Sequence, residues 1–216
     1  MKKYKILSFV CLFALVGFFS CQPNDPPLNE FSDVFIDWSP RTINVHDSVS
    51  IVDGSRGVKK RLWTLPGGGV ADIIGSDNDA TSTERILKTK FLKSGQYDIR
   101  LQDEFNDPSV TLDSLITITV LDYVSAKFVS DAQTQNGILM IEAGKVINYT
   151  SVSTGSPEFY EWIFEGGVPQ TATGSHPSVK YSQPGSYDVT LIAYRKQPKG
   201  SDTIVVKDFI KVIPSN

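Results

Sequence analysis

A tryptophan-centred motif and a tyrosine-centred motif occur together twice in this chain, roughly 100 residues apart. The second copy joins Trp162-Ile-Phe-Glu-Gly-Gly to Gly185-Ser-Tyr-Asp-Val-Thr-Leu. The first joins Trp63-Thr-Leu-Pro-Gly-Gly to Gly95-Gln-Tyr-Asp-Ile-Arg-Leu. This period is too long for a solenoid repeat and fits two sandwich domains in tandem. The repeat therefore predicts that one β-fold occurs twice.

The segment around each tyrosine alternates between apolar and polar residues. Tyr187, Val189 and Leu191 fall on one face of an extended strand, and residues 97–101 follow the same pattern. No apolar period of helical length follows the N-terminal segment, so we predict an all-β chain of two tandem immunoglobulin-like β-sandwiches. The residues expected in the structural core are Trp63, Tyr97, Trp162 and Tyr187.

The N-terminus has the pattern of a targeting segment. Lysines precede an apolar run from Ile6 to Phe19, which suits a secretory signal better than a membrane span of ~20 residues. The run ends at Phe18-Phe19-Ser20-Cys21, which resembles a bacterial lipoprotein signal with a lipidated cysteine. An ordinary signal peptide with an incidental cysteine is the alternative. We expect a signal peptide over residues 1–20 and lipidation at Cys21.

The rest of the chain divides into a tether and two domains. Residues 21–30 contain three prolines and few apolar side chains, which is typical of an extended tether. The first sandwich is expected over residues 31–122 and the second over residues 123–216. Because almost no linker separates them, we expect a semi-rigid pair of domains.

The second copy of the motifs resembles a known family. Tyr160-Glu-Trp-Ile-Phe-Glu-Gly-Gly and Pro184-Gly-Ser-Tyr-Asp-Val-Thr-Leu are similar to the PKD domain, a secreted β-sandwich, in the variant common in lipoproteins of the Bacteroidetes. The resemblance covers the second domain nearly end to end and the first more weakly. Glu165 and Gly166 stand where the family often has Gly and Asp. The resemblance implies a spacer, adhesion or carbohydrate-associated module without a cofactor.

Charge and chemistry exclude several classes of function. The formal charge of −3 becomes more negative once the N-terminal lysines are removed, so we expect no nucleic-acid partner. His46 and His176 lie in loop-like polar sequence, away from any nucleophile elbow or metal-binding pair, and no enzyme is expected. Asp77-Asn78-Asp79 clusters oxygen ligands as calcium sites do, with a solvated turn as the alternative.

Surface aromatic residues are the candidate ligand contacts, because sugar rings stack on exposed aromatic rings. These residues are Trp38, Phe159, Tyr160 and Tyr194, together with Tyr123. If a specific partner exists, we expect it at the loops Glu165–Gln170 and Gly67–Thr89, which differ between the copies. Three Asp-Ser/Thr-apolar triplets also resemble an O-glycosylation pattern of Bacteroidetes secreted proteins, with Ser48, Ser114 and Thr203 as acceptors; strand entries have the same pattern.

These observations predict an outer-membrane lipoprotein, lipid-anchored and exposed at the cell surface, that acts as a binding or adhesion module in glycan capture. Its expected partners are the membrane, through the lipid anchor, and a polysaccharide or another cell-surface protein. The alternative is a structural spacer or accessory subunit that positions a neighbouring transporter or hydrolase and binds no ligand itself.

Overall fold

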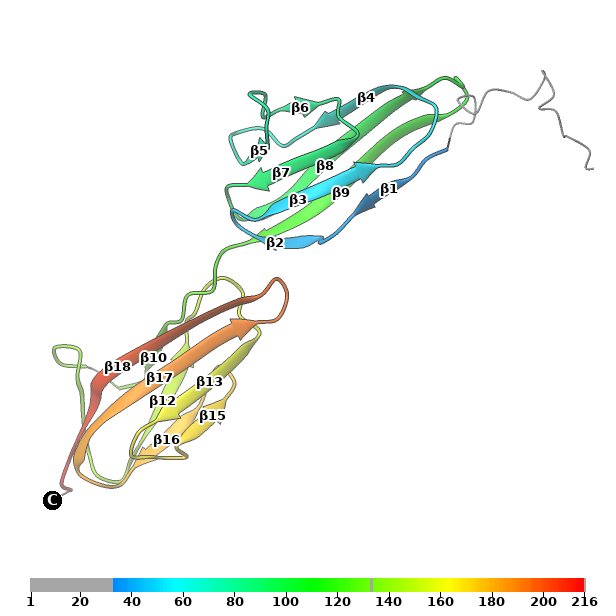
Figure 1. The fold of residues 1–216 in the computed structure, drawn as a ribbon. Helices are drawn as coiled ribbons and strands as arrows, with labels where there is room; N and C mark the ends of the chain where they lie inside the picture. The colour runs from blue at the N-terminus through cyan, green and yellow to red at the C-terminus, as the bar shows by residue number, and fades with distance from the viewer. Residues whose placement is uncertain (1–32, 133, 216) are drawn as a thin grey trace, which may run out of the picture.

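The computed structural model describes residues 33–132 and 134–215, which form strands and loops. The predicted all-β class is confirmed. Figure 1 shows two β-sandwiches arranged end to end, with the described chain entering at one end of the pair and leaving at the other. None of the described residues belongs to a helix that could cross a membrane. The predicted signal peptide, Cys21 and the tether lie outside the described residues.

The first sandwich packs a four-stranded sheet against a five-stranded sheet. The four-stranded sheet runs in the order β1 (Ile36–Trp38), β3 (Ser48–Asp53), β7 (Ile86–Phe91) and β5 (Ala71–Ile73). The five-stranded sheet runs in the order β2 (Thr42–Asn44), β9 (Thr111–Leu121), β8 (Gly95–Phe105), β4 (Val58–Thr64) and β6 (Thr81–Ser82). Strand β2 is parallel to β9, and the other pairings are antiparallel.

The second sandwich repeats this arrangement. Its four-stranded sheet has the order β10 (Phe128–Ser130), β12 (Lys145–Ser151), β16 (Ser178–Tyr181) and β14 (Gly167–Val168). Its five-stranded sheet has the order β11 (Leu139–Glu142), β18 (Gly200–Ile213), β17 (Gly185–Arg195), β13 (Phe159–Phe164) and β15 (Thr171–Thr173). The predicted boundary between residues 122 and 123 falls in the connector between β9 and β10.

The two repeated tryptophans fill equivalent places in the two cores. Trp63 on β4 and Trp162 on β13 are almost completely buried. Each indole Nε1 donates a hydrogen bond of 2.8 Å to a main-chain carbonyl, Trp63 to Glu84 and Trp162 to Gly174. A buried indole N–H without a partner would be costly, so these bonds fix each loop to its core.

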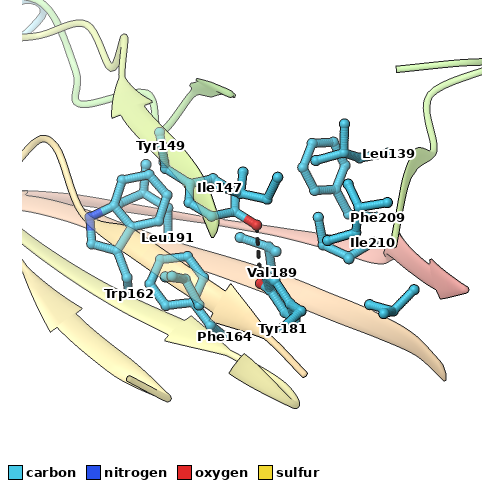
Figure 2. Close-up of a cluster of buried hydrophobic side chains, with 14 of the residues drawn as sticks. Leu139, Ile147, Tyr149, Trp162, Phe164, Tyr181, Val189, Leu191, Phe209 and Ile210 are labelled. Atoms are coloured by element: carbon cyan, nitrogen blue, oxygen red, sulfur yellow. Dashed lines mark hydrogen bonds between the residues drawn. The ribbon is translucent and has the colours of Figure 1, made fainter. Parts of the chain in front are cut away.

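The core of the second domain is rich in aromatic rings. Figure 2 shows Tyr149 and Tyr181 with their hydroxyl groups hydrogen-bonded to each other between the sheets, at 3.0 Å. Burial raises the pKa of both phenols. The Tyr149 ring also lies 4.8 Å from that of Phe164, centroid to centroid.

The repeated Gly-x-Tyr sequence has a physical explanation. Tyr97 and Tyr187 are half-buried, and each folds back over the glycine two residues before it, so that a Cβ at Gly95 or Gly185 would lie 2.9 or 2.8 Å from the tyrosine ring. The Tyr97 hydroxyl donates to the carbonyl of Ser94, and the Tyr187 hydroxyl to that of Gln183, both at 3.0 Å. Only glycine leaves room for this closed turn.

One buried arginine joins the two domains. Arg195, at the end of β17, is 1% exposed. Its Nη2 donates to Asn44 Oδ1 of the first domain at 2.5 Å and to the Asp122 carbonyl at 2.9 Å, and its Nε donates to the Pro198 carbonyl. Asn44 Nδ2 in turn donates to the Lys199 carbonyl at 3.5 Å. These bonds fix the hairpin between β17 and β18 against the first domain.

A cluster of buried charges lies in the first domain. The side chains of Asp53 and Asp103 are fully buried, and Arg61 forms an ion pair with Asp53 and lies 3.8 Å from Asp103 Oδ1. Burial raises the pKa of Asp103 to about 7, and the neighbouring Asp53 carboxylate adds to the shift. Burial also opposes ionisation of Asp53, but hydrogen bonds from Ser55, Asp103 and Arg61 outweigh it and lower that pKa. The pair therefore holds one proton over much of the acidic range.

We predict that Arg195→Met weakens the contact between the two domains. The substitution keeps most of the side-chain volume but leaves Asn44 without its donor, which costs about 1–3 kcal/mol. In a protein of residues 22–216, spin labels are attached at the exposed positions Ser50 and Lys180. Double electron–electron resonance should give a broader distance distribution for Arg195→Met than for the wild type. Arg100→Met, on an exposed surface pair, is the control and should leave the distribution narrow. An unchanged distribution in Arg195→Met would show that other contacts fix the domains.

The acid pair predicts that the first domain loses stability as pH rises. Asp103 binds its proton more tightly in the folded state, so its contribution is fully present below pH 3.8 and is lost as pH rises to about 7. Asp53, whose pKa is lowered, acts in the opposite direction and only below pH 3.8.

Asp103→Asn should remove this loss, which is on the order of a few kcal/mol. Urea unfolding can be followed in a Trp162→Phe background, where Trp38 and Trp63 report on the first domain alone. Asp103→Asn should then be more stable than the background at pH 8 and similar at pH 4, whereas the exposed control Asp37→Asn should track the background. Parallel pH profiles for Asp103→Asn and the background would contradict the shared proton.

Candidate binding site

Two of the predicted aromatic contacts meet on the second domain. Phe159 on β13 and Tyr194 on β17 are cross-strand partners whose rings stack 5.2 Å apart. The Tyr194 hydroxyl donates to Glu161 Oε1 at 3.0 Å, and this bond raises the pKa of Tyr194. Lys196 Nζ lies 4.9 Å from the centre of the Phe159 ring. The phenol of Tyr194 is therefore held in one orientation at the surface.

The other predicted aromatic contacts lie elsewhere. Trp38 is half-buried and packs against the core of the first domain, with the Arg41 guanidinium 4.9 Å from the ring centre. Tyr160 packs against the core of the second domain. Tyr123 is 56% exposed in the connector between the domains. None of these three rings lies on the sheet face that carries Tyr194.

The outward side chains of β13, β17 and β18 form one surface, which we call the Tyr194 face. They alternate with buried or half-buried residues along each strand and lie opposite one another in the sheet register. The Tyr194 face consists of Phe159, Glu161, Ile163, Thr190, Ile192, Tyr194, Thr203 and Val205. Ile163 and Val205 are each about half exposed, so the face combines apolar side chains with hydroxyl groups around one carboxylate.

The equivalent face of the first domain has a different chemistry. Arg100 on β8 forms a two-bond ion pair with Asp113 on β9, and Lys60 on β4 pairs with Glu104 at 3.1 Å. Their charges largely compensate one another across the strands. Exposed charged side chains are well hydrated, so this face is stable in contact with water. The Tyr194 face is the more apolar of the two.

The predicted metal and histidine sites gain no additional ligands. Asp77 and Asp79 are exposed, and Asn78 between them folds the loop, with Oδ1 accepting from the main-chain N–H groups of Ala80 and Thr81. Within the described residues no three His, Cys, Asp or Glu side chains gather to hold a metal ion. His176 Nδ1 is hydrogen-bonded to the adjacent Ser175 hydroxyl at 2.7 Å in a surface turn, and His46 is exposed.

The three predicted glycosylation acceptors all lie in strands. Ser48 and Thr203 are exposed on β3 and β18, and Ser114 is half-buried on β9. The aspartate before each has a structural role; Asp202, for example, accepts from the Ala126 N–H at 2.7 Å. Glycosylation at any of them stays a prediction. Thr203 belongs to the Tyr194 face, so a glycan there would cover part of that face.

The two loops expected to differ between the copies are partly ordered into strands. Glu165–Gln170 contains β14, which pairs with β16, and Gly67–Thr89 contains β5, β6 and part of β7. The second of these loops also lines a cavity of about 380 Å³. The sequence did not predict this cavity, because its walls come from strands in both sheets.

Comparison with known protein families supports the sandwich architecture of the second domain. Residues 131–207 match the model of the PKD domain. No curated protein matches the chain. Among solved structures, Rst D1-D2 is 14% identical with a TM-score of 0.49, over 82% of this chain and 99% of that one. The D00-D0 domain of Intimin is 12% identical with a TM-score of 0.46, over 80% and 98%.

The fibronectin(III)-like modules of Clostridium thermocellum CbhA are 12% identical with a TM-score of 0.35, over 83% of this chain and 95% of that one. The match to the PKD model covers most of the second sandwich, and the first sandwich repeats its strand order. The chain therefore consists of two tandem immunoglobulin-like β-sandwiches, and the second is similar to the PKD domain over residues 131–207.

Proposed function

We propose that this protein is a non-catalytic, lipid-anchored surface module that captures polysaccharide through the Tyr194 face. PKD and immunoglobulin-like domains are often binding or adhesion modules and are typically non-catalytic. The proposed location at the outer membrane depends on Cys21 and the apolar run before it, both in the sequence alone.

The Tyr194 face carries the proposal. Because a sheet is rigid, little conformational entropy is lost when a ligand binds to it. Threonine hydroxyls and the Glu161 carboxylate offer donors and acceptors that match sugar hydroxyls, and the Tyr194 ring offers a fixed apolar surface. Phe159 has a supporting role, since Tyr194 and Lys196 already lie against its ring.

The arrangement of the domains is consistent with display. The described chain enters the first sandwich at the end farthest from the second (Figure 1). An anchor at Cys21 would therefore hold the first domain near the membrane and present the second domain outward. The first domain, whose equivalent sheet face carries two ion pairs, would then act as the stem.

The second candidate function is a spacer that binds no ligand. The observation that favours it is the junction, where Arg195 holds the two domains in one orientation. A fixed orientation is useful for positioning a neighbouring transporter or hydrolase. It is equally useful for presenting a binding face, so the junction alone does not decide between the two functions.

An affinity screen tests the proposed function. Residues 22–216 should be retained by at least one immobilised polysaccharide, and Tyr194→Ala should weaken retention about 10-fold or more, because a stacking surface and a hydroxyl are lost together. Tyr123→Ala makes the same change at an exposed tyrosine away from the face and should bind as the wild type does. Retention that is equal in Tyr194→Ala and wild type would place the site elsewhere, and no retention by any polysaccharide would favour the spacer.

Lipidation has a separate test. Mass spectrometry of the protein purified from membranes should show a mature chain that begins at Cys21 and carries acyl groups, because several acyl chains give stable anchoring. A Cys21→Ser variant should appear in the soluble fraction. A mature chain that begins at Gln22, or a free Cys21 thiol, would contradict the lipid anchor.

A further inference from the structure

The first domain contains a cavity in the segment where the two copies differ most. The stretch from Trp63 to Gly95 is longer than that from Trp162 to Gly185, and the extra residues lie before β6, most of them between β5 and β6. The segment from Ile73 to Lys88 lines an open cavity of about 380 Å³, at the lower end of the roughly 300–1,000 Å³ typical of small-ligand sites. A small ligand fits this cavity.

The lining combines an apolar wall with neutral polar groups. Ile74 and Ile86 are exposed by 50% and 45%, although both are large aliphatic residues. The lining also has the hydroxyl or amide groups of Ser76, Thr83 and Asn78, among others. Apolar faces together with hydroxyl donors and acceptors match a saccharide, whose ring carries C–H groups on its faces and hydroxyls on its edge.

The walls of the cavity are held in place before any ligand binds. Asn78 Oδ1 accepts from two main-chain N–H groups, and its Nδ2 donates to Thr81 Oγ1 at 2.9 Å. The Glu84 N–H donates to Ser82 Oγ at 3.2 Å. Behind them, the buried Trp63 indole fixes the Glu84 carbonyl. A preformed site reduces the entropy lost on binding.

The charged residues of the lining favour a neutral ligand. Glu84 and Lys88 both line the cavity, and one of each sign would also suit a zwitterion such as an amino acid. Both residues are exposed, however, and exposed ion pairs contribute little because water screens them. The neutral hydroxyl and amide groups outnumber them, so recognition would depend on hydrogen bonds to an uncharged polyol.

We propose that this cavity is a second binding site, which takes one neutral saccharide unit. The inference rests on the proposed function in its ligand class, and it adds a site in the first domain that is separate from the Tyr194 face. A polysaccharide held on the second domain could then have a residue or a chain end bound in the first. Each site can be altered without touching the other.

Saturation-transfer NMR on residues 22–216 tests the cavity directly. The probes are methyl glycosides of glucose, galactose and mannose, with glycine as the zwitterion. Ile74→Trp fills the cavity without removing a polar group, and Thr83→Val removes one hydroxyl at nearly constant volume. Leu115→Trp is the matched control, since Leu115 is 63% exposed on β9 of the same domain and outside the cavity. Thermal melting checks that each variant is folded.

We expect transfer to at least one neutral glycoside in wild type, Leu115→Trp and Tyr194→Ala. It should fall at least about 10-fold in Ile74→Trp and several-fold in Thr83→Val, in line with the loss of the site and of one hydrogen bond. Absence of transfer to every glycoside in wild type, transfer to glycine alone, or undiminished transfer in Ile74→Trp would each overturn the inference.

The failures of the two proposals are distinguishable. Glycoside binding lost in Tyr194→Ala but kept in Ile74→Trp would overturn the cavity site and support the face. Glycoside binding lost in Ile74→Trp, together with no retention of the wild type by any polysaccharide, would support the cavity and overturn capture through the Tyr194 face.

Discussion

A buried hydrogen bond from a tryptophan indole to a main-chain carbonyl organises both domains. In each sandwich the tryptophan fills the space between the sheets, and its Nε1 reaches the loop that precedes the next strand of the opposite sheet. The bond satisfies the only polar atom of a large apolar side chain, so it can be kept while the loop changes. In the first domain the extra residues lie before β6, so the Glu84 carbonyl keeps the same place after β6 while the longer segment ahead of it lines the cavity. The same interaction that stabilises the core therefore permits the two copies to differ at their surfaces.

The surfaces do differ, although the strand orders are the same. On β4, β8 and β9 of the first domain the outward residues form ion pairs across the sheet. At the equivalent register positions of the second domain the four charged residues of these pairs are replaced by aromatic residues and threonines, namely Phe159, Thr190, Tyr194 and Thr203. Because core positions alternate with outward positions along each strand, these outward residues can change without cost to the core. The consequence is a more apolar sheet surface in the second domain and a more charged one in the first.

Local patterns predicted the architecture, and contacts distant in sequence account for what was missed. Alternation and the Gly-x-Tyr turn were sufficient to assign Trp63 and Trp162 to the core, and the structure explains the glycine through the ring that folds over it. Arg195 and Asp103 could not be found in this way. Both occupy inward positions, where alternation predicts apolar residues, and their burial depends on partners such as Asn44 and Asp53 from other strands. Short strand segments do not reveal which face of the sheet is covered, so the sequence does not show that Trp38 and Tyr160 pack against the cores.

The contact between the two domains fixes the orientation of the Tyr194 face relative to the first domain. Tyr194 and Arg195 are neighbours on β17, so alternation directs one side chain to the outer face and the other into the contact with the first domain. Any rotation of the second domain that moved the Tyr194 face would have to break the hydrogen bonds of Arg195 to Asn44 and Asp122. Breaking them would leave Asn44 with a buried, unpaired oxygen, which is costly. A force applied at the Tyr194 face would therefore pass through β17 to the first domain, and the two sandwiches would move together.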